Sequence, residues 1–267
     1  MCKVSGTIVT VMNLNYIVMD LEFNQSFDFK DGTKAVVEPA CSFEIIQIGL
    51  VKLGADFNIL ETLELNIRPT LYKRIHPFVA KITGITHRDI YSGAQTFPQS
   101  FDRICSLIGS PDNIFVVWGG TDVNLLFRNI NYHKLSISGI PVKYIDVQAL
   151  ASRRLNTKSG TSVGLKNAVS ALEIEQDEPF HNALSDALYT TKVLDVLRGS
   201  EPNMEKHIKT FGYPSGGGVS KRKMKALSYN IVALYREAEK MFGHKLSTSQ
   251  KKIVKNIYEM GMENKFK

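Results

Sequence analysis

The feature that most constrains the fold is a short apolar run that ends in two acidic residues, Tyr16-Ile-Val-Met-Asp20-Leu-Glu22-Phe. Such a run is typical of a β-strand, in which successive side chains point to opposite faces, so Asp20 and Glu22 emerge on the same face roughly 7 Å apart. Two carboxylates held side by side repel each other unless a cation lies between them or one is protonated. A divalent metal ion with oxygen ligands explains the pair most simply, and a solvent-facing strand end with two unrelated acids is the alternative.

The composition is that of a folded chain with room for one large α/β domain and an extension. The chain has 267 residues, of which 43% are hydrophobic, and no bias signals disorder. No apolar run approaches the roughly 20 residues that cross a bilayer, and no signal-peptide pattern opens the sequence, so we expect no membrane partner. The cysteines Cys2, Cys41 and Cys105 have no paired spacing, which predicts reduced thiols and a cytoplasmic location.

The positive charge is concentrated at the C-terminal end. The net charge is +7, but residues 201–267 hold 14 Lys and Arg against 6 Asp and Glu, a balance of +8, which leaves 19 basic and 20 acidic residues, or −1, in the rest. This asymmetry predicts a partner that carries phosphates, with a solvated basic tail as the alternative.

The hydrophobic pattern predicts a mixed sheet that continues into alternating helices and strands. Two β-rich segments, 43–53 and 57–67, have a connection short enough for an antiparallel hairpin. Further strands are expected at 16–22, 113–118 and 142–145, and helices at 78–83, 97–108, 121–133, 147–155, 163–172 and 183–198.

The chain is expected to divide into three parts. A catalytic domain is predicted over residues 14–200 and a linker over 201–220, because Tyr213-Pro-Ser-Gly-Gly-Gly-Val219 has the composition of a flexible segment. Residues 221–267 form a small basic extension with two amphipathic helices, 221–240 and 247–260. Their lysines are expected either to bind the phosphate backbone of a nucleic acid or to form a solvated face.

Two more acidic positions accompany the first pair. Asp122 follows the apolar run that ends in Trp118-Gly-Gly, and Asp186 lies about one turn inside the helix expected at 183–198, with His181 just before that helix. In α/β sheets, ligands gather at the carboxyl ends of the strands, where Asp122 is placed by its sequence position. Asp186 can face the sheet while the imidazole of His181 overhangs it.

These residues make a coherent hydrolytic site. Asp20, Glu22, Asp122 and Asp186 can hold two divalent cations about 4 Å apart, which activate a water molecule and stabilise the departing 3′-oxygen in phosphoryl displacement. Oxygen ligands favour Mg²⁺ or Mn²⁺ over zinc. His181 can accept the proton of the water as a general base.

Simpler roles compete with these assignments. Asp122 can merely stabilise the N-terminal end of its helix, and His181 can be an ordinary surface histidine. Asp146 can replace Asp122 as a ligand, although its place before the helix expected at 147–155 favours an N-cap.

The order of the three motifs resembles the DEDDh subgroup of the DnaQ-like 3′→5′ exonucleases, which have a ribonuclease-H-like fold. The matching segments are Asp20-Leu-Glu22, Trp118-Gly-Gly-Thr-Asp122 and His181-Asn-Ala-Leu-Ser-Asp186-Ala187, with weaker similarity at Glu44-Ile-Ile-Gln-Ile-Gly49 and Ile82-Thr-Gly-Ile-Thr86. The first motif is similar to the exoribonuclease branch that includes the sporulation inhibitor KapD. The resemblance implies an α/β, ribonuclease-H-like fold, with a mixed five-stranded sheet flanked by helices.

The resemblance also implies a substrate and a reaction. The substrate is single-stranded RNA or DNA with a free 3′ end, RNA favoured, and the products are nucleoside 5′-monophosphates. Leu21, Phe23, Thr83, Gly84 and Ile85 are implied to surround the terminal nucleotide; the Phe23 ring either stacks on the terminal base or packs in the core. A DNA proofreading or repair exonuclease and a non-catalytic binding module are the rival functions, and the sequence identifies no protein partner.

Overall fold

The computed structural model describes residues 14–27, 37–158, 161–201 and 203–212, together with Lys245, Ser247, Thr248, Gln250 and Lys251. The chain divides into two compact units, the first formed by Met1–Val36 with Phe43–Gly212 and the second by Val37–Ser42 with Tyr213–Lys267. The first unit contains the sheet and every residue that the sequence assigns to catalysis. The domain boundaries expected from the sequence stay a prediction.

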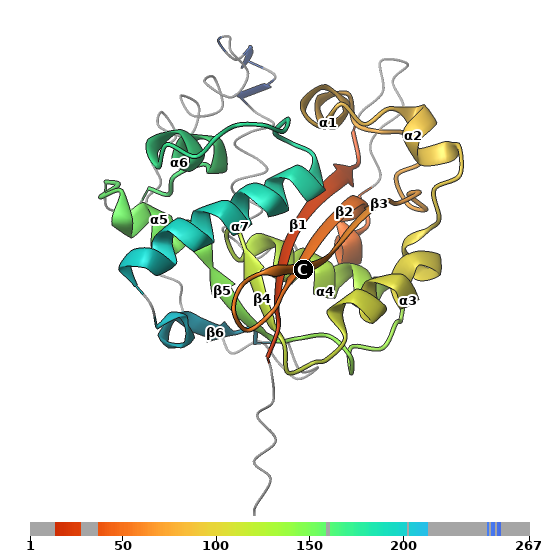
Figure 1. Ribbon diagram of the computed structural model, residues 1–267. Helices are drawn as coiled ribbons and strands as arrows, with labels where there is room; N and C mark the ends of the chain where they lie inside the picture. The colour runs from red at the N-terminus through yellow and green to blue at the C-terminus, as the bar shows by residue number, and fades with distance from the viewer. Residues whose placement is uncertain are drawn as a thin grey trace, which may run out of the picture. The chain divides into compact units, whose positions relative to one another are not determined.

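The sheet of the first unit is mixed and has the strand order β3-β2-β1-β4-β5-β6 (Figure 1). Its strands are β1 (Tyr16–Gln25), β2 (Phe43–Leu53), β3 (Ile59–Asn66), β4 (Ile114–Val117), β5 (Lys143–Asp146) and β6 (Ile208–Thr210). The pairs β1/β2, β2/β3 and β5/β6 are antiparallel, whereas β1/β4 and β4/β5 are parallel. The predicted mixed sheet and the β2–β3 hairpin are therefore confirmed, with six strands where five were expected.

The additional strand lies inside the segment that the composition predicts as a linker. β6 follows a short 3-10 helix, η2 (Met204–His207), and pairs antiparallel with β5. Residue Phe211, just beyond β6, stacks its ring on Phe127 at a centroid distance of 4.8 Å. A three-residue strand leaves almost no periodic pattern in a sequence, so only the pairing partner reveals it.

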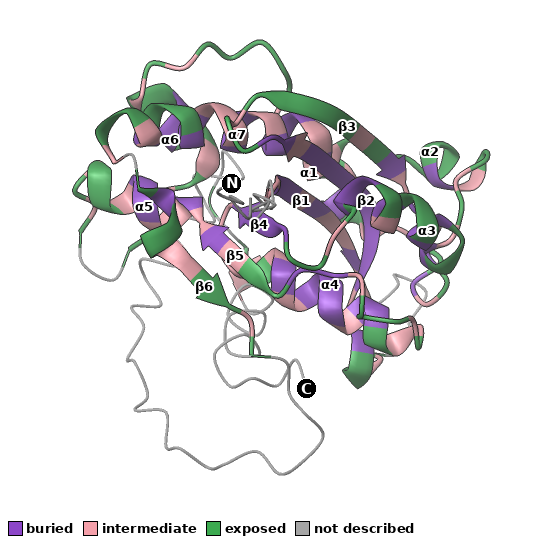
Figure 2. Cartoon of the chain, turned by 60° about the horizontal axis from the view of Figure 1, so that its bottom comes forward, coloured by how far each residue is buried: buried purple, intermediate pink, exposed green. Residues whose placement is uncertain are grey.

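Helices cover both faces of the sheet. They are α1 (Pro77–Thr83), α2 (His87–Tyr91), α3 (Phe97–Ile108), α4 (Thr121–Tyr132), α5 (Val147–Arg154), α6 (Leu165–Ala171) and α7 (Ala183–Ser200). α7 crosses one face over β1 and β2, and α4 lies on the opposite face, so that the strands run between them in both views (Figures 1 and 2). None of the helices in the described ranges has the length and apolar character of a membrane span.

Buried residues fill both faces of the sheet, and one cluster lies between the central strands and α7. Figure 2 shows buried residues along β1, β2 and β4, while the edge strands β3 and β6 carry exposed ones. Val18 of β1 and Val51 of β2 pack in one cluster with Val193 and Leu194 of α7. Fully burying one such side chain contributes about 1.5–3 kcal/mol, so this cluster fixes α7 across the sheet.

Parts of the sequence-based prediction fall outside the described residues. They include the helix expected at 221–240 and most of the one expected at 247–260, of which Ser247, Thr248, Gln250 and Lys251 are described. Within the second unit, the Ser247 hydroxyl accepts a hydrogen bond from the Gln250 N–H, and the Gln250 side chain accepts one from the Ser247 N–H. This reciprocal pair is the capping box of a helix N-terminus, as the Ser-rich sequence there suggests.

Candidate active site

One face of strand β1 is apolar in its first half and acidic in its second half. Its alternate residues Tyr16 and Val18 belong to the core beneath α7, and the next two residues on that face are Asp20 and Glu22. Because directly paired residues of antiparallel strands share a face, the partners of Asp20 and Glu22 on β2, Gly49 and Gln47, also lie on the α7 side. The acidic pair therefore lies where the hydrophobic contact between β1 and α7 ends.

Gly49 allows the start of α7 to approach the sheet closely. A Cβ atom on Gly49 would overlap the carbonyl group of Ala183 and the backbone nitrogen of Leu184. Only glycine leaves space for the helix backbone at this point. Asp186, one turn further along α7, is thereby brought to the carboxylates of β1.

We expect Gly49→Ala to displace the start of α7. The overlap with backbone atoms cannot be relieved by a side-chain rotation, so the free energy of unfolding should fall by about 1–3 kcal/mol. Because a displacement of about 1 Å can lower a catalysed rate by about 100-fold, the cleavage rate should fall with it. Chemical denaturation and cleavage assays measure both effects.

Gly139→Ala is the matched control, because a Cβ at Gly139 meets no atom within 4 Å. If Gly49→Ala were as stable and as active as Gly139→Ala, the close approach of α7 would have no role in shaping the site.

A hydrogen-bond network holds the first residues of α7 against β2 and β3. The Gln47 side chain accepts from the Ala183 N–H at 2.9 Å and donates to Glu64 and Asn66 at 3.1 and 3.0 Å. The N-cap residue of α7, Asn182, donates to the same Glu64 oxygen at 2.6 Å. Gln47 lies outside the three acidic motifs, and its place two residues before Gly49, on the same strand face, is the signal in the sequence that could have found it.

His181 lies immediately before the N-cap of α7, with an unusual backbone. Its φ is +65°, a region that non-glycine residues seldom occupy and that tends to occur at functional sites. The His181 N–H donates to Asp186 Oδ2 at 3.3 Å, and the side chain is exposed. Glu22, His181 and Asp186 each offer one potential metal-ligand atom, and these three atoms lie within 4.8 Å of one another.

Asp122 reaches the site from the opposite face of the sheet. It is the second residue of α4, after a turn in which Gly119 has φ +90°. Helix α4 is anchored to β2 by Asn129, whose side chain accepts from the Ile45 N–H and donates to the Phe43 carbonyl oxygen. Because α4 follows β4 in the chain, its first residues lie at the carboxyl end of β4, and β4 is paired with β1.

The four carboxylates lie close enough to disfavour one another's negative charge. Burial raises the pKa of Glu22 to about 8, and the charges of Asp186 and Asp122 add to the increase. The pKa of Asp122 is raised to about 8 by burial and by Asp186. Burial, followed by Asp122, Asp186 and Glu22, raises the pKa of Asp20 well above its ordinary value.

Asp186 completes the set and offers an oxygen with no partner. Burial raises its pKa to about 6, against the opposing effect of the His181 N–H. Asp186 is 8% exposed, and among the described residues its Oδ1 is buried without a hydrogen bond. A buried carboxylate oxygen without a donor is costly, and repulsion among the four acids adds to that cost. A divalent cation relieves both, so this set of residues fits a metal site.

The environment of His181 favours a neutral imidazole. Although the residue is exposed to solvent, neighbouring atoms partly shield its imidazole from water, which lowers its pKa, and the positive charge of Lys166 on α6 lowers it further. A neutral imidazole can accept a proton, which is what a general base requires.

The residues implied to surround the terminal nucleotide lie near the end of β1 and around α1, in different degrees of burial. Leu21 and Ile85 are buried, and the half-buried Phe23 ring packs edge-on against Phe43 at 6.5 Å. Thr83 donates from its hydroxyl to the Val79 carbonyl oxygen. Gly84 is exposed and ends α1 with φ +70°. Their role in substrate binding stays a prediction.

Two other acidic residues have structural roles. Asp146 accepts from the Ala149 N–H at 3.0 Å as the N-cap of α5, which is the role that its sequence position favoured. It also pairs with Lys209 at 2.9 Å. Glu44, which is buried, accepts hydrogen bonds from the N–H groups of Thr70, Leu71 and Tyr72. It therefore holds the loop that leads to α1.

Fold and site together define a nuclease of the four-carboxylate type with an accompanying histidine. The family model described as RNase_T, exonuclease, matches residues 17–194. The chain therefore belongs to the RNase_T exonuclease family, and the predicted DEDDh class of DnaQ-like 3′→5′ exonucleases is confirmed.

Solved structures of low sequence identity share the fold. The nuclease domain of 3′hExo, a DEDDh family member bound to rAMP, is 18% identical with a TM-score of 0.59, over 76% of this chain and 99% of that one. A second similar structure is a 3′-exonuclease that recognises the histone mRNA stem-loop. It is 17% identical with a TM-score of 0.58, over 74% of this chain and 85% of that one.

E. coli Exonuclease I in complex with a dA16 oligonucleotide is 17% identical with a TM-score of 0.52, over 72% of this chain and 42% of that one. A comparison with curated protein sequences finds no match.

Proposed function

We propose that this protein is a metal-dependent 3′→5′ exonuclease that removes nucleoside 5′-monophosphates from single-stranded nucleic acid, with RNA preferred over DNA. The observation that carries the proposal is the meeting of four mutually repelling carboxylates from β1, α4 and α7, with a buried, unpaired oxygen on Asp186. Such an arrangement is costly to fold and is explained by cation binding.

Each residue has a distinct task in the proposed reaction. Asp20, Glu22, Asp122 and Asp186 would hold two divalent cations, Mg²⁺ or Mn²⁺, which would supply activation of a water molecule and neutralisation of charge on the phosphate. His181 accepts the proton of the attacking water, because it is exposed to solvent, lies beside Glu22 and Asp186, and has a lowered pKa. The Gln47 network keeps the start of α7, and so His181, in place.

A basic segment beside the site supports a nucleic acid substrate. Residues 68–89 contain five Lys and Arg residues and one acid, Asp89, and this segment carries α1 and the Thr83–Ile85 turn. Asn24 at the end of β1 is fully buried and bonds to the backbone at Tyr72, Arg74 and His76. The segment is thus tied to the strand that carries Asp20 and Glu22, where its cations can meet substrate phosphates.

The preference for RNA rests on the sequence resemblance and on two structural neighbours, a 3′-exonuclease that recognises the histone mRNA stem-loop and the 3′hExo nuclease domain bound to rAMP. E. coli Exonuclease I, with its dA16 ligand, supports the second candidate, a DNA-directed exonuclease with the same chemistry.

The test uses 5′-labelled RNA and DNA oligonucleotides of matched sequence, incubated with the full chain and Mn²⁺ or Mg²⁺. We expect a ladder that shortens from the 3′ end, nucleoside 5′-monophosphates as products, no cleavage in excess chelator, and a faster rate on RNA. A faster rate on DNA supports the DNA-directed candidate. Binding without cleavage under all metal conditions contradicts the proposal.

A further inference from the structure

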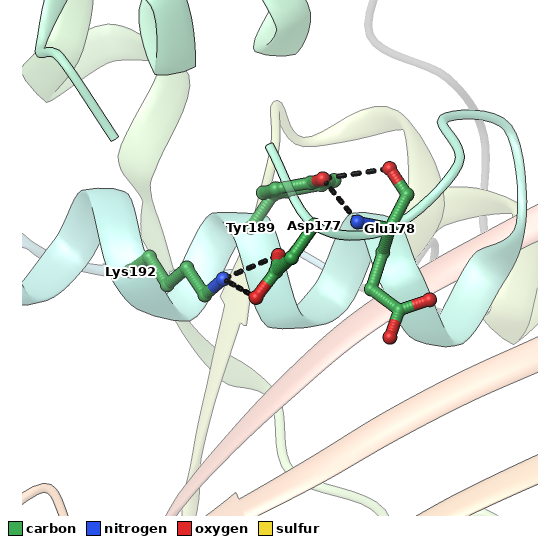
Figure 3. Close-up of polar contacts among 4 residues, drawn as sticks. All are labelled: Asp177, Glu178, Tyr189 and Lys192. Carbon is green, nitrogen blue, oxygen red and sulfur yellow. Dashed lines mark hydrogen bonds and ion pairs between the residues drawn. The ribbon is translucent and has the colours of Figure 1, made fainter. Parts of the chain in front are cut away.

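The segment 177–181, which leads to His181, is fastened to α7 by one buried tyrosine. The Tyr189 hydroxyl accepts from the Glu178 N–H at 2.8 Å and donates to the Glu178 carbonyl oxygen at 2.7 Å. Figure 3 shows both bonds converging on the hydroxyl. Tyr189 is only 1% exposed and belongs to the core beneath α7, so the segment is bonded to a rigid part of the fold.

Side-chain stacking adds to these bonds. The Phe180 ring stacks on the Tyr189 ring with a centroid distance of 4.6 Å and an interplanar angle of 15°. Lys192 lies over Tyr189 at 5.3 Å and pairs with Asp177 at 2.6 Å, and Lys166 lies over Phe180 at 5.6 Å. The pairing of Lys192 with Asp177 is also visible in Figure 3. Tyr189 thus contacts the segment through its hydroxyl and its ring.

The Gln47 network holds the residues that follow His181, and the segment 177–180 leads into it from the other side. His181 follows Phe180 directly, its backbone has φ +65°, its side chain is exposed, and its N–H makes a bond of 3.3 Å to Asp186. A residue in this conformation keeps it only where the surroundings enforce it. The contacts of Tyr189 with Glu178 and Phe180, both just before His181, provide that constraint.

We propose that Tyr189 is a positioning residue, which holds segment 177–181 so that the His181 imidazole stays beside Glu22 and Asp186. The proposal rests on the proposed function, in which His181 accepts the proton of the attacking water. Tyr189 is buried and acts through the backbone of Glu178 and the ring of Phe180.

The main test is a double-mutant cycle between Tyr189→Phe and His181→Ala, with cleavage measured at saturating Mn²⁺. Tyr189→Phe keeps the stacked ring and removes the hydroxyl. We expect kcat to fall by about tenfold with KM within about twofold, because substrate and metal contacts are kept. In the His181→Ala background the same change should alter kcat by less than about twofold, since the positioned group is already absent.

Thr191→Val is the control, because it removes a side-chain bond to the Ala187 carbonyl oxygen on the same helix without touching the segment. Its kcat should match that of the unmodified protein. An unchanged kcat for Tyr189→Phe, or a full tenfold loss in the His181→Ala background, overturns the proposal in favour of a purely structural tyrosine.

A second measurement does not depend on activity. Hydrogen exchange of the Glu178 amide should be faster in Tyr189→Phe than in Thr191→Val; equal exchange overturns the proposal. Should Tyr189→Phe fold poorly, Lys192→Met replaces it in both measurements, with the same direction and a smaller change. If the unmodified protein cleaves nothing, the proposed function fails, while the exchange result still decides whether Tyr189 holds the segment.

Discussion

Asp20→Asn is expected to lower the rate of cleavage by about 10⁴-fold or more at saturating Mg²⁺ or Mn²⁺, comparable to the loss of a central catalytic group in other hydrolases. Asp20 interacts electrostatically with Asp122, Asp186 and Glu22, so it lies at the centre of the proposed metal site. The amide is nearly isosteric but carries no charge, and cation binding should weaken accordingly. Single-turnover cleavage and Mn²⁺ titration measure the two losses.

The same substitution should stabilise the metal-free protein at high pH. The pKa of Asp186 is raised to about 6, and those of Glu22 and Asp122 to about 8. A carboxylate whose pKa is raised in the folded state contributes stability below its unfolded pKa and loses that contribution as the pH rises through the folded value. For Asp186 alone, the rise of the pKa from its ordinary value to about 6 corresponds to about 3 kcal/mol of stability. The free energy of unfolding should therefore fall between about pH 4 and pH 8.

Thermal melts in chelator at pH 5 and pH 9 check this expectation. Asp20→Asn should melt at a higher temperature than the unmodified protein at pH 9, with a smaller difference at pH 5, and added Mg²⁺ should stabilise only the unmodified protein. Asp112→Asn changes an exposed carboxylate and serves as the control. Parallel pH dependences for all three proteins would show that the four acids do not repel one another in the folded state.

His181→Ala is expected to lower kcat by about 10²–10⁴-fold, the usual contribution of a general base, with Mn²⁺ affinity nearly unchanged. Burial and Lys166 lower the pKa of His181 below its ordinary value. The rate should therefore rise with pH through a value below 6.5 and then level off, and this step should vanish in the variant. Rate–pH profiles and Mn²⁺ calorimetry provide the measurements.

His207→Ala is the comparison, since His207 pairs with Glu201 near β6 and should leave the profile unaltered. A large loss of Mn²⁺ affinity in His181→Ala would make His181 a metal ligand and remove it from the proton-transfer role.

Local pattern and motif order were sufficient for much of the fold and for the identity of the acidic residues. β2 and α3 have the bounds that the apolar spacing predicts, 43–53 and 97–108, because long periodic segments are shaped by their own sequence. α2, with five residues, and β6, with three, were not predicted, since such short elements carry too little periodicity. They depend instead on the Thr86–Asp89 capping box and on pairing with β5.

By itself, the sequence determined that this chain carries Asp20, Glu22, Asp122, His181 and Asp186 in the order of the DEDDh exonucleases, on a mixed α/β sheet. Only the tertiary structure decided how they meet. The absence of a side chain at Gly49 matters because Ala183 passes over it, and Tyr189 matters because its hydroxyl reaches Glu178. The physical reason is that these contacts join residues distant in the chain or on different elements, and no local periodicity records which backbone will pass over which side chain.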